Sequence, residues 1–207
     1  WPLFLEKAWA KVNGGYANII AGDPRDVFQA FTPFAAVPIE IAKENKKTLW
    51  ENIRDADAYN CIMTASIDEG VSGLVQVGLL ANHTFSLVSA FERKIGEETV
   101  HLMKLRNPLG EGEWIGDWSD KSAKWTEEAK TAFPEFDVNT KNDGIFWISY
   151  EDFIKYFSTV CLCVPVKPLC TSTYKVDEEK AKGFNVIKLK MLGDGVLNVD
   201  VKKPSYR

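Results

Sequence analysis

Two polar residues at the ends of predicted strands have the types that proton-transfer chemistry uses. His83 immediately precedes the predicted strand 84–92, and it is one of only two histidines in the chain. Asn107 follows the run 98–106 and precedes Pro108, which favours an extended backbone and aims the asparagine side chain off the strand end. An asparagine oxygen can accept the proton of one imidazole nitrogen, so that the other nitrogen is free to pair with a thiol. This is the arrangement of a Cys-His-Asn hydrolase.

Each of these residues also has an ordinary structural interpretation. A single histidine at a strand end is most often a hydrogen-bonded surface residue, and asparagine before proline is common in turns. The second histidine, His101, lies between Val100 and Leu102 in a predicted strand and is interpreted as structural or exposed. The residue types alone therefore leave a catalytic pair and two structural residues as alternatives.

Composition and charge exclude several classes of protein. The chain has 207 residues, 45% of them hydrophobic, which is enough for one substantial core. The net charge of −4 and the absence of Lys/Arg blocks argue against nucleic acid or an anionic membrane surface as a partner. No apolar run approaches the ~18 residues of a transmembrane helix, and we expect no signal peptide. Because the chain begins with Trp1 rather than Met, we expect it to be part of a longer protein.

The four cysteines form no metal or disulfide pattern. Cys161 and Cys163 share one side of a predicted strand, whereas Cys61 and Cys170 stand apart from them. A Cys-x-Cys pair without a second pair of ligands is not a four-ligand zinc site. We therefore expect buried free thiols in a reducing, cytoplasmic compartment.

Hydrophobic periodicity predicts helices first and strands later. Three amphipathic helices are expected, over residues 2–13, 24–31 and 43–56. Val27, Ala30 and Phe31 are expected to face inward in the second of them. Segments rich in β-branched and aromatic residues are predicted as strands, namely 60–67, 74–80, 84–92, 98–106, 145–148, 159–164, 186–191 and 196–201.

Two further segments have a helical pattern. Residues 120–133 are expected to be helical or irregular, and Ser149 with Asp152 forms a capping-box pattern for a short helix. The order of the elements predicts an α+β fold rather than a doubly wound sheet. Six aromatic residues are expected to pack in the interior: Trp114, Trp118, Trp125, Phe146, Trp147 and Phe153.

Four ordered blocks of sequence resemble the calpain family of papain-like cysteine proteases. The blocks are LEKAWAKVNGGYANIIAG, NHTFSLVSAF, KLRNPLGEGEWIGDWSD and NDGIFWISYEDFIKYF. The resemblance covers residues 1–163 and implies the second subdomain of the protease core, an antiparallel barrel-like sheet with flanking helices. It matches His83 and Asn107 to the catalytic His and Asn of the family. Residues 164–207 would be a connector and the start of a β-sandwich domain.

The resemblance places the nucleophilic cysteine outside this chain. None of the four cysteines stands in a Gly-Asp-Cys-Trp-like context, and Cys61 lies in a predicted strand, where burial would keep it a neutral thiol. The expected partners are therefore an upstream subdomain that carries the cysteine, and protein substrates. We expect that this chain alone does not hydrolyse peptides.

The resemblance further implies a calcium site at Glu113, Asp120 and Asp143. Calcium takes about 6–8 oxygen ligands, which three carboxylates with carbonyls and water could supply. Ile145 stands where the family has a further acid, and this change removes one charge from the site. A solvated acidic loop without calcium is the alternative interpretation.

Two more departures lie beside the predicted catalytic pair. Leu109 replaces a tryptophan that shields the pair in the family, and Asn82 replaces a glycine that gives room to the substrate backbone. The departures leave two hypotheses. The first is the His/Asn half of a calcium-dependent calpain-like endopeptidase, and the second is an inactive calpain-like regulatory or protein-binding module.

Overall fold

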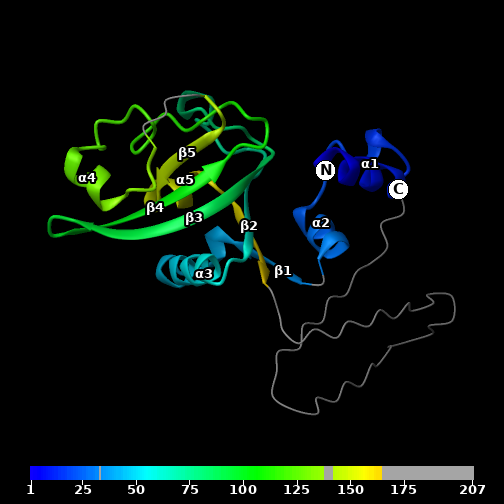
Figure 1. Cartoon of the computed structure of the whole chain (residues 1–207), viewed down its shortest axis with the longest axis horizontal. Helices are drawn as coiled ribbons and strands as arrows, with labels where there is room; N and C mark the ends of the chain where they lie inside the picture. The colour runs from blue at the N-terminus through cyan, green and yellow to red at the C-terminus, as the bar shows by residue number, and fades with distance from the viewer. Residues whose placement is uncertain (33, 138–141, 165–207) are drawn as a thin grey trace, which may run out of the picture.

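A six-stranded antiparallel sheet, in the order β1-β6-β2-β3-β4-β5, forms the framework of the computed structural model (Figure 1). The structure describes residues 1–32, 34–137 and 142–164. The strands are β1 (Ala35–Glu40), β2 (Ile62–Ile67), β3 (His83–Ile95), β4 (Glu98–Arg106), β5 (Ile145–Ser149) and β6 (Thr159–Val164). The antiparallel sheet agrees with the barrel-like sheet that the family resemblance implied, but in the described part of the chain the edge strands β1 and β5 do not pair with each other, so the sheet is not closed.

Five α-helices and three short 3-10 turns surround the sheet in the described residues, which confirms the α+β class. The helices are α1 (Pro2–Val12), α2 (Pro24–Phe31), α3 (Lys46–Ala58), α4 (Glu127–Ala132) and α5 (Tyr150–Tyr156). The 3-10 turns are η1 (Tyr16–Asn18), η2 (Ile41–Lys43) and η3 (Val75–Val77). Ser149 caps α5 by accepting a hydrogen bond from the Asp152 backbone N–H at 3.0 Å, as its capping pattern predicted.

The main core lies between the sheet, α3 and α5. Leu49, Trp50 and Ile53 of α3 are buried there, as the helical spacing predicted. Phe85 of β3 is also fully buried, and its ring meets the ring of Phe146 edge-on, with 5.9 Å between centroids. Strand β3 is thereby fixed close to its first residue.

A second core packs on the other side of β4 and β5 and holds α4 in place. The rings of Trp125 and Phe136 stack at 3.7 Å between centroids, and Trp147 of β5 meets Trp125 edge-on at 5.7 Å. All six aromatic residues expected in the interior are buried. These aromatics therefore serve packing, as predicted.

The segment 74–80, predicted as a strand, is instead irregular around η3. Gly78 has a φ of +77°, and a Cβ at this position would lie 2.0 Å from the Glu113 carbonyl oxygen. The close approach, together with a hydrogen bond of 3.1 Å from the Ile115 N–H to the Val77 carbonyl, packs the segment against the loop after β4. The apolar run is thus a packed loop, not a strand.

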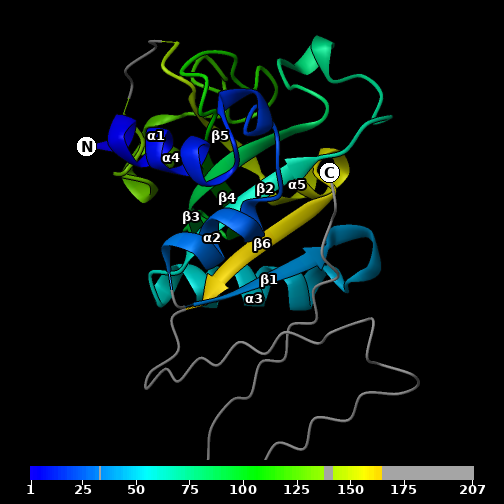
Figure 2. The same cartoon turned by 90° about the vertical axis from the view of Figure 1, so that its right-hand side faces the viewer.

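Strand β1 was not predicted, because Pro38 interrupts its pattern. Proline is tolerated here because β1 is an edge strand and pairs only with β6. Figure 2 shows β1, β6 and β2 side by side, with α2 against β6 and β1. Helix α2 buries Phe28 against Cys161 and Cys163, so the predicted inward face of this helix was wrong.

Several predictions fall outside the described residues. They are the strands at 186–191 and 196–201, Cys170, and most of the predicted segment 164–207. Within the described part of the chain, the helices are all too short or too polar to span a membrane.

Candidate active site

The imidazole of His83 and the side-chain amide of Asn107 are in direct contact. His83 Nε2 lies 2.8 Å from Asn107 Oδ1. His83 is the first residue of β3 and Asn107 follows the last residue of β4, and these strands are antiparallel neighbours. The start of β3 and the end of β4 therefore lie at the same end of the sheet, which brings together two residues distant in sequence.

The hydrogen bonds of Asn107 determine which imidazole nitrogen carries the proton. Asn107 is fully buried, and its Nδ2 donates to the carbonyl oxygens of Glu111 at 2.7 Å and Gly112 at 3.1 Å. Because two carbonyls require the amide nitrogen on their side, Oδ1 must face His83 and can only accept. His83 Nε2 is then the donor, and in the neutral ring Nδ1 is left with its lone pair as a base.

The backbone of Asn107 is held by the turn before β5. Its N–H donates to the carbonyl of Gly144 at 2.7 Å. Gly144 has a φ of +83°, and a Cβ there would lie 2.7 Å from the Asn107 carbonyl oxygen. Glycine is therefore required at this position, both for its backbone conformation and for the close approach.

The surroundings of His83 explain one departure from the family pattern. Asn82 adopts a φ of +51° and is exposed. Asparagine is among the few side chains that tolerate this left-handed conformation, so it can replace the family's glycine without breaking the turn. The His83 ring is half-buried and packs on the edge of Phe85, with 4.8 Å between centroids.

Leu109 does not cover the pair as a tryptophan would. Its side chain is 63% exposed, whereas its backbone N–H donates to Asn107 Oδ1 at 3.1 Å. The backbone contact that helps to place Asn107 is thus kept, and the side chain contributes little shielding.

The three predicted calcium ligands lie near one another, but they are not gathered as a metal site. Burial raises the pKa of Asp120 to about 6, and the negative charges of Glu113 and Asp143 add to this rise. Glu113 Oε1 accepts the backbone N–H groups of Asp143 and Gly144, each at 2.8 Å. Among the described residues, no three His, Cys, Asp or Glu side chains are grouped closely enough to hold a metal ion.

The chemistry of this acidic loop nevertheless fits a calcium ion. Its donors are carboxylate oxygens, which Ca²⁺ prefers. Burial first, and then repulsion by Glu113 and Asp143, raises the pKa of Asp120, and a bound cation would offset both effects. Ile145 offers only its backbone, whose N–H donates to Asp143 Oδ1 at 3.0 Å. Calcium binding would therefore have to draw the remaining carboxylates closer together.

The described cysteines are not candidates for the nucleophile. Cys61 precedes β2, whose far end, Ile67, pairs with His83. Six residues of extended chain separate Cys61 from this pairing position, about 20 Å at ~3.3 Å per residue. Burial raises the pKa of Cys61, and it raises that of Cys161 to about 11, so both thiols stay neutral. Cys163 is buried against Phe28.

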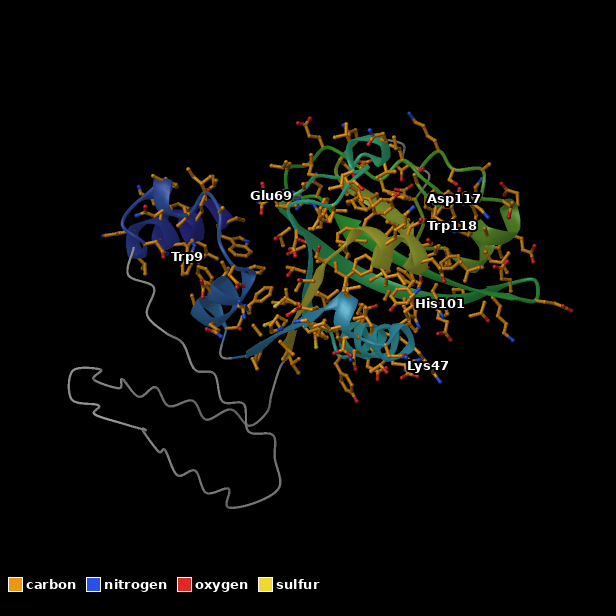
Figure 3. The ribbon with its side chains drawn as sticks, turned by 180° about the vertical axis from the view of Figure 1, so that it is seen from behind. Trp9, Lys47, Glu69, His101, Asp117 and Trp118 are labelled. Carbon is orange, nitrogen blue, oxygen red and sulfur yellow. The ribbon has the colours of Figure 1, made fainter. Side chains whose placement is uncertain are left out.

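His101 has a structural environment, as predicted. Its Nε2 lies 3.0 Å from Glu92 Oε2, which also accepts the Trp50 indole N–H at 3.0 Å. The rings of His101 and Trp50 are 4.4 Å apart, and Figure 3 shows His101 beside α3. The hydrogen bond from Trp50 and then that from His101 lower the pKa of Glu92. These contacts join α3 to the β3–β4 hairpin.

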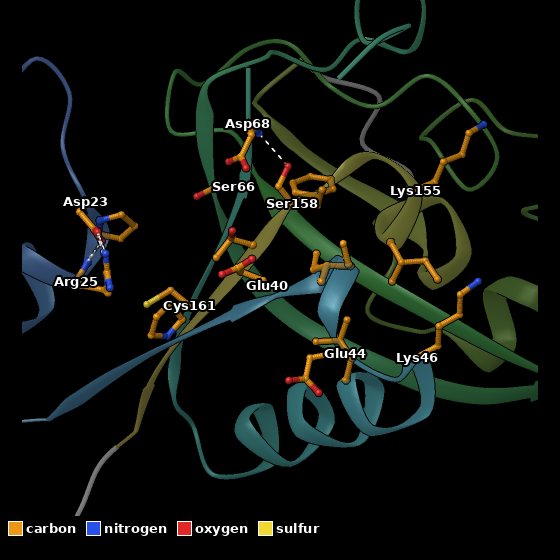
Figure 4. Close-up of a pocket in the computed structure, with 18 of the residues that line it drawn as sticks. Asp23, Arg25, Glu40, Glu44, Lys46, Ser66, Asp68, Lys155, Ser158 and Cys161 are labelled. Atoms are coloured by element: carbon orange, nitrogen blue, oxygen red, sulfur yellow. Dashed lines mark hydrogen bonds and ion pairs between the residues drawn. The ribbon is translucent and has the colours of Figure 1, made fainter. Parts of the chain in front are cut away.

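A groove of about 920 Å³ is lined by residues of α2, β1, α5 and the ends of β2 and β6, and neither His83 nor Asn107 lines it (Figure 4). Ser66 lines this groove, and its hydroxyl lies 2.9 Å from that of Thr84, the residue after His83. Asp68 and Ser158 form the adjoining wall, where Ser158 Oγ accepts the Asp68 N–H at 3.0 Å. Sequence patterns did not indicate this groove, because its walls come from separate elements.

Comparisons with known proteins agree with the geometry. A family profile described as calpain family cysteine protease matches residues 1–164. The chain is 34% identical over 166 residues to a calpain of Schistosoma mansoni, covering 79% of this chain and 22% of that protein. It is 31% identical over 169 residues to the calpain-1 catalytic subunit of Homo sapiens, and 27% identical over 198 residues to calpain-5 of Mus musculus. These matches cover 79% and 86% of this chain, and 23% and 31% of those relatives.

Proposed function

Because the chain belongs to the calpain family of cysteine proteases, we propose that it is the His/Asn-bearing half of a Cys-His-Asn endopeptidase. The observation that carries the proposal is the hydrogen bond between His83 Nε2 and Asn107 Oδ1. It fixes the imidazole in the tautomer that a thiol nucleophile needs, with Nδ1 as the base. The thiol itself would come from an upstream subdomain.

The reaction is acyl transfer, and one imidazole accepts and donates a proton in both acylation and deacylation. His83 Nδ1 takes the thiol proton, and the thiolate attacks the carbonyl carbon of the scissile peptide. The imidazolium then gives its proton to the leaving amine, and the acyl-enzyme thioester is hydrolysed by water that His83 activates. Asn107 holds the ring in place and accepts from Nε2 throughout.

Exposed apolar side chains at the N-terminal end support a missing partner half. Trp1, which precedes α1, is 83% exposed, and Phe4 within α1 is 79% exposed. Ile20 after η1 is 85% exposed. Trp9 of α1, labelled in Figure 3, contacts α2 through the ring of Phe31, with 5.8 Å between the ring centroids. An apolar surface of this kind is a common sign of an interface. The chain also spans less than a third of the relatives' length.

Calcium is proposed as a regulator rather than as a reactant. Glu113, Asp120 and Asp143 would hold it, and the bound ion would neutralise their repulsion and order the loops around Asn107. The three described cysteines are free thiols, which supports a reducing, cytoplasmic location.

An inactive regulatory module is the second candidate. Ile145 in the acidic loop and the exposed Leu109 beside the pair favour it. The parent gene would discriminate the two functions, because a Gly-Asp-Cys-Trp-like motif upstream of Trp1 supports the protease. Serine, glycine or lysine in place of that cysteine supports the module.

The decisive experiment joins this chain to the upstream segment of its parent protein and measures hydrolysis of a casein-like substrate. We expect turnover in the joined protein, loss of turnover in His83→Ala, and retained turnover in His101→Ala, whose imidazole lies in the α3 contact instead. Unchanged hydrolysis in His83→Ala would remove His83 from the mechanism.

A further inference from the structure

Both backbone groups of Gly144, its carbonyl and its N–H, make hydrogen bonds to residues of the candidate active site. Its carbonyl accepts the Asn107 N–H at 2.7 Å, and its own N–H donates to Glu113 Oε1 at 2.8 Å. The same carboxylate oxygen accepts the Asp143 N–H, also at 2.8 Å. A single residue thus links the Glu113 carboxylate to the backbone of the asparagine that orients His83.

The carboxylate makes the stronger part of this link. Two successive backbone N–H groups that point at one anion form a favourable anion-binding concavity. Hydrogen bonds to an ionised acceptor are also roughly twice as strong as neutral ones. Asn142 adds a neutral tie from the same turn, because its Oδ1 accepts the Gly112 N–H at 3.1 Å. Glu113 is therefore the charged anchor between the turn before β5 and the loop after β4.

Asn107 depends on both segments that Glu113 joins. Its backbone N–H needs the Gly144 carbonyl, and its Nδ2 needs the carbonyls of Glu111 and Gly112. If the turn moved away from the loop, these acceptors would separate and Asn107 Oδ1 would no longer be aimed at His83. The Glu113 carboxylate, which accepts the N–H groups of Asp143 and Gly144, is the contact that keeps the turn against this loop.

We propose that Glu113 is a positioning residue that fixes the His83 tautomer through Gly144 and Asn107. The proposal deepens the proposed protease function and rests on it for its importance to catalysis. Glu113 touches neither the imidazole nor a reacting atom, so its effect must appear in the state of the His83 ring. The proposal includes that the Glu113 carboxylate makes both hydrogen bonds without calcium.

The test is nitrogen-15 NMR of the imidazole rings in the whole 207-residue chain, with a calcium chelator present. In the unmodified chain we expect His83 to be predominantly the Nε2–H tautomer, with an Nε2 proton that exchanges slowly. In Glu113→Ala the ratio of Nε2–H to Nδ1–H should fall about fivefold, the ratio that one net hydrogen bond supplies. Glu113→Gln should keep most of the preference, because its side-chain oxygen can still accept both N–H groups.

Glu111→Ala is the matched control. It removes the same charge from the same loop, while the Glu111 backbone carbonyl that receives Asn107 Nδ2 remains. The His83 tautomer should be unchanged in this variant. If Glu113→Ala and Glu111→Ala both leave the tautomer ratio as in the unmodified chain, the proposal is wrong.

Two further comparisons keep the test decisive. Should Glu113→Ala fail to fold, as judged by tryptophan fluorescence, Glu113→Asp replaces it, since the shorter carboxylate keeps the charge and cannot reach both N–H groups equally. A tautomer ratio unaltered in Glu113→Asp then overturns the proposal. A Glu113 contact that forms only with calcium would show the Glu113 effect only after calcium is added, which also contradicts it. Because no step needs peptide hydrolysis, the outcome is separate from that of the proteolysis experiment.

Discussion

Replacing Asp120 by asparagine should stabilise the chain at neutral pH in the absence of calcium. The pKa of Asp120 is raised from 3.8 to about 6, first by burial and then by Glu113 and Asp143. The folded state therefore binds this proton more tightly than the unfolded state does. The contribution of protonated Asp120 to the free energy of unfolding is fully present below about pH 4. This contribution is lost as pH rises through about 6, where the partly buried carboxyl group must ionise.

The size of the effect follows from the same shift. A rise from 3.8 to about 6 is worth at most about 3 kcal/mol, at about 1.4 kcal/mol per pKa unit. Asp120 is only half-buried, and solvent screening reduces the expected gain to about 1–1.5 kcal/mol. Asparagine keeps the shape of the side chain but has no charge, so Asp120→Asn should gain this amount at pH 7.5 and nothing near pH 4.

The assay is urea denaturation with a chelator, followed by the fluorescence of the seven tryptophans. Asp117→Asn is the control, because the Asp117 side chain is exposed and its ion pair with Lys124 Nζ, at 3.9 Å, is a weak surface contact. Its free energy of unfolding should change by less than about 0.5 kcal/mol. An Asp120→Asn variant that is no more stable at pH 7.5 than at pH 4, relative to the unmodified chain, would refute the raised pKa of Asp120 that burial and the neighbouring carboxylates produce.

Calcium binding should depend on the Asp120 carboxylate. If Glu113, Asp120 and Asp143 hold the ion, titration calorimetry on the unmodified chain should show saturable heat, and Asp120→Ala should abolish it. A flat titration of the unmodified chain would exclude the site.

Substitutions at three other positions test Asn107, a buried hydroxyl of β2 and the turn before His83. Asn107→Ala should cost about 2–4 kcal/mol of unfolding free energy by urea denaturation, because it removes the hydrogen bonds of a fully buried amide, and a loss under 1 kcal/mol would contradict the network. Thr64→Val should raise the same free energy by about 1 kcal/mol, since Thr64 Oγ1 is buried and finds no hydrogen-bond partner in the described residues; a loss would show that it has one. Asn82→Ala should lower the free energy of unfolding by about 1 kcal/mol because of the positive φ at this position, whereas Asn82→Gly should not. Equal stability of the two variants would contradict backbone strain there. In the whole enzyme, Asn82→Gly should raise the turnover of a peptide substrate.

The sequence predicted best where a pattern is local. The strands that became β3 and β4 were recognisable because their buried residues alternate or cluster over a long run. Residues 74–80 misled, because an apolar run has the same appearance whether it pairs in a sheet or packs as a loop against Glu113. The buried face of α2 depended on Cys161 and Cys163 of β6, which no periodicity within the helix could reveal.

The candidate site shows the same division between local and distant information. Residue chemistry and the family resemblance identified His83 and Asn107, and the antiparallel pairing of their strands explains why they meet. The part played by Gly144 could not be predicted, because it depends on a turn that approaches from another strand pair. Its only signal in the sequence was an Asp-Gly turn, which is common in loops of any function.

The arrangement of the pair has a consequence for how such a protease would be switched. The imidazole, the amide and the carboxylate behind them are already in hydrogen-bonded order in a chain that lacks the thiol. Under the proposed function, assembly with the other half would then not have to build the base and would only have to bring sulfur to Nδ1. Regulation by calcium or by a partner would then act on the distance between the halves, so mutations in the acidic loop should change activation more than they change the state of His83. Glu113 is the exception, since it belongs to both the acidic loop and the support of Asn107.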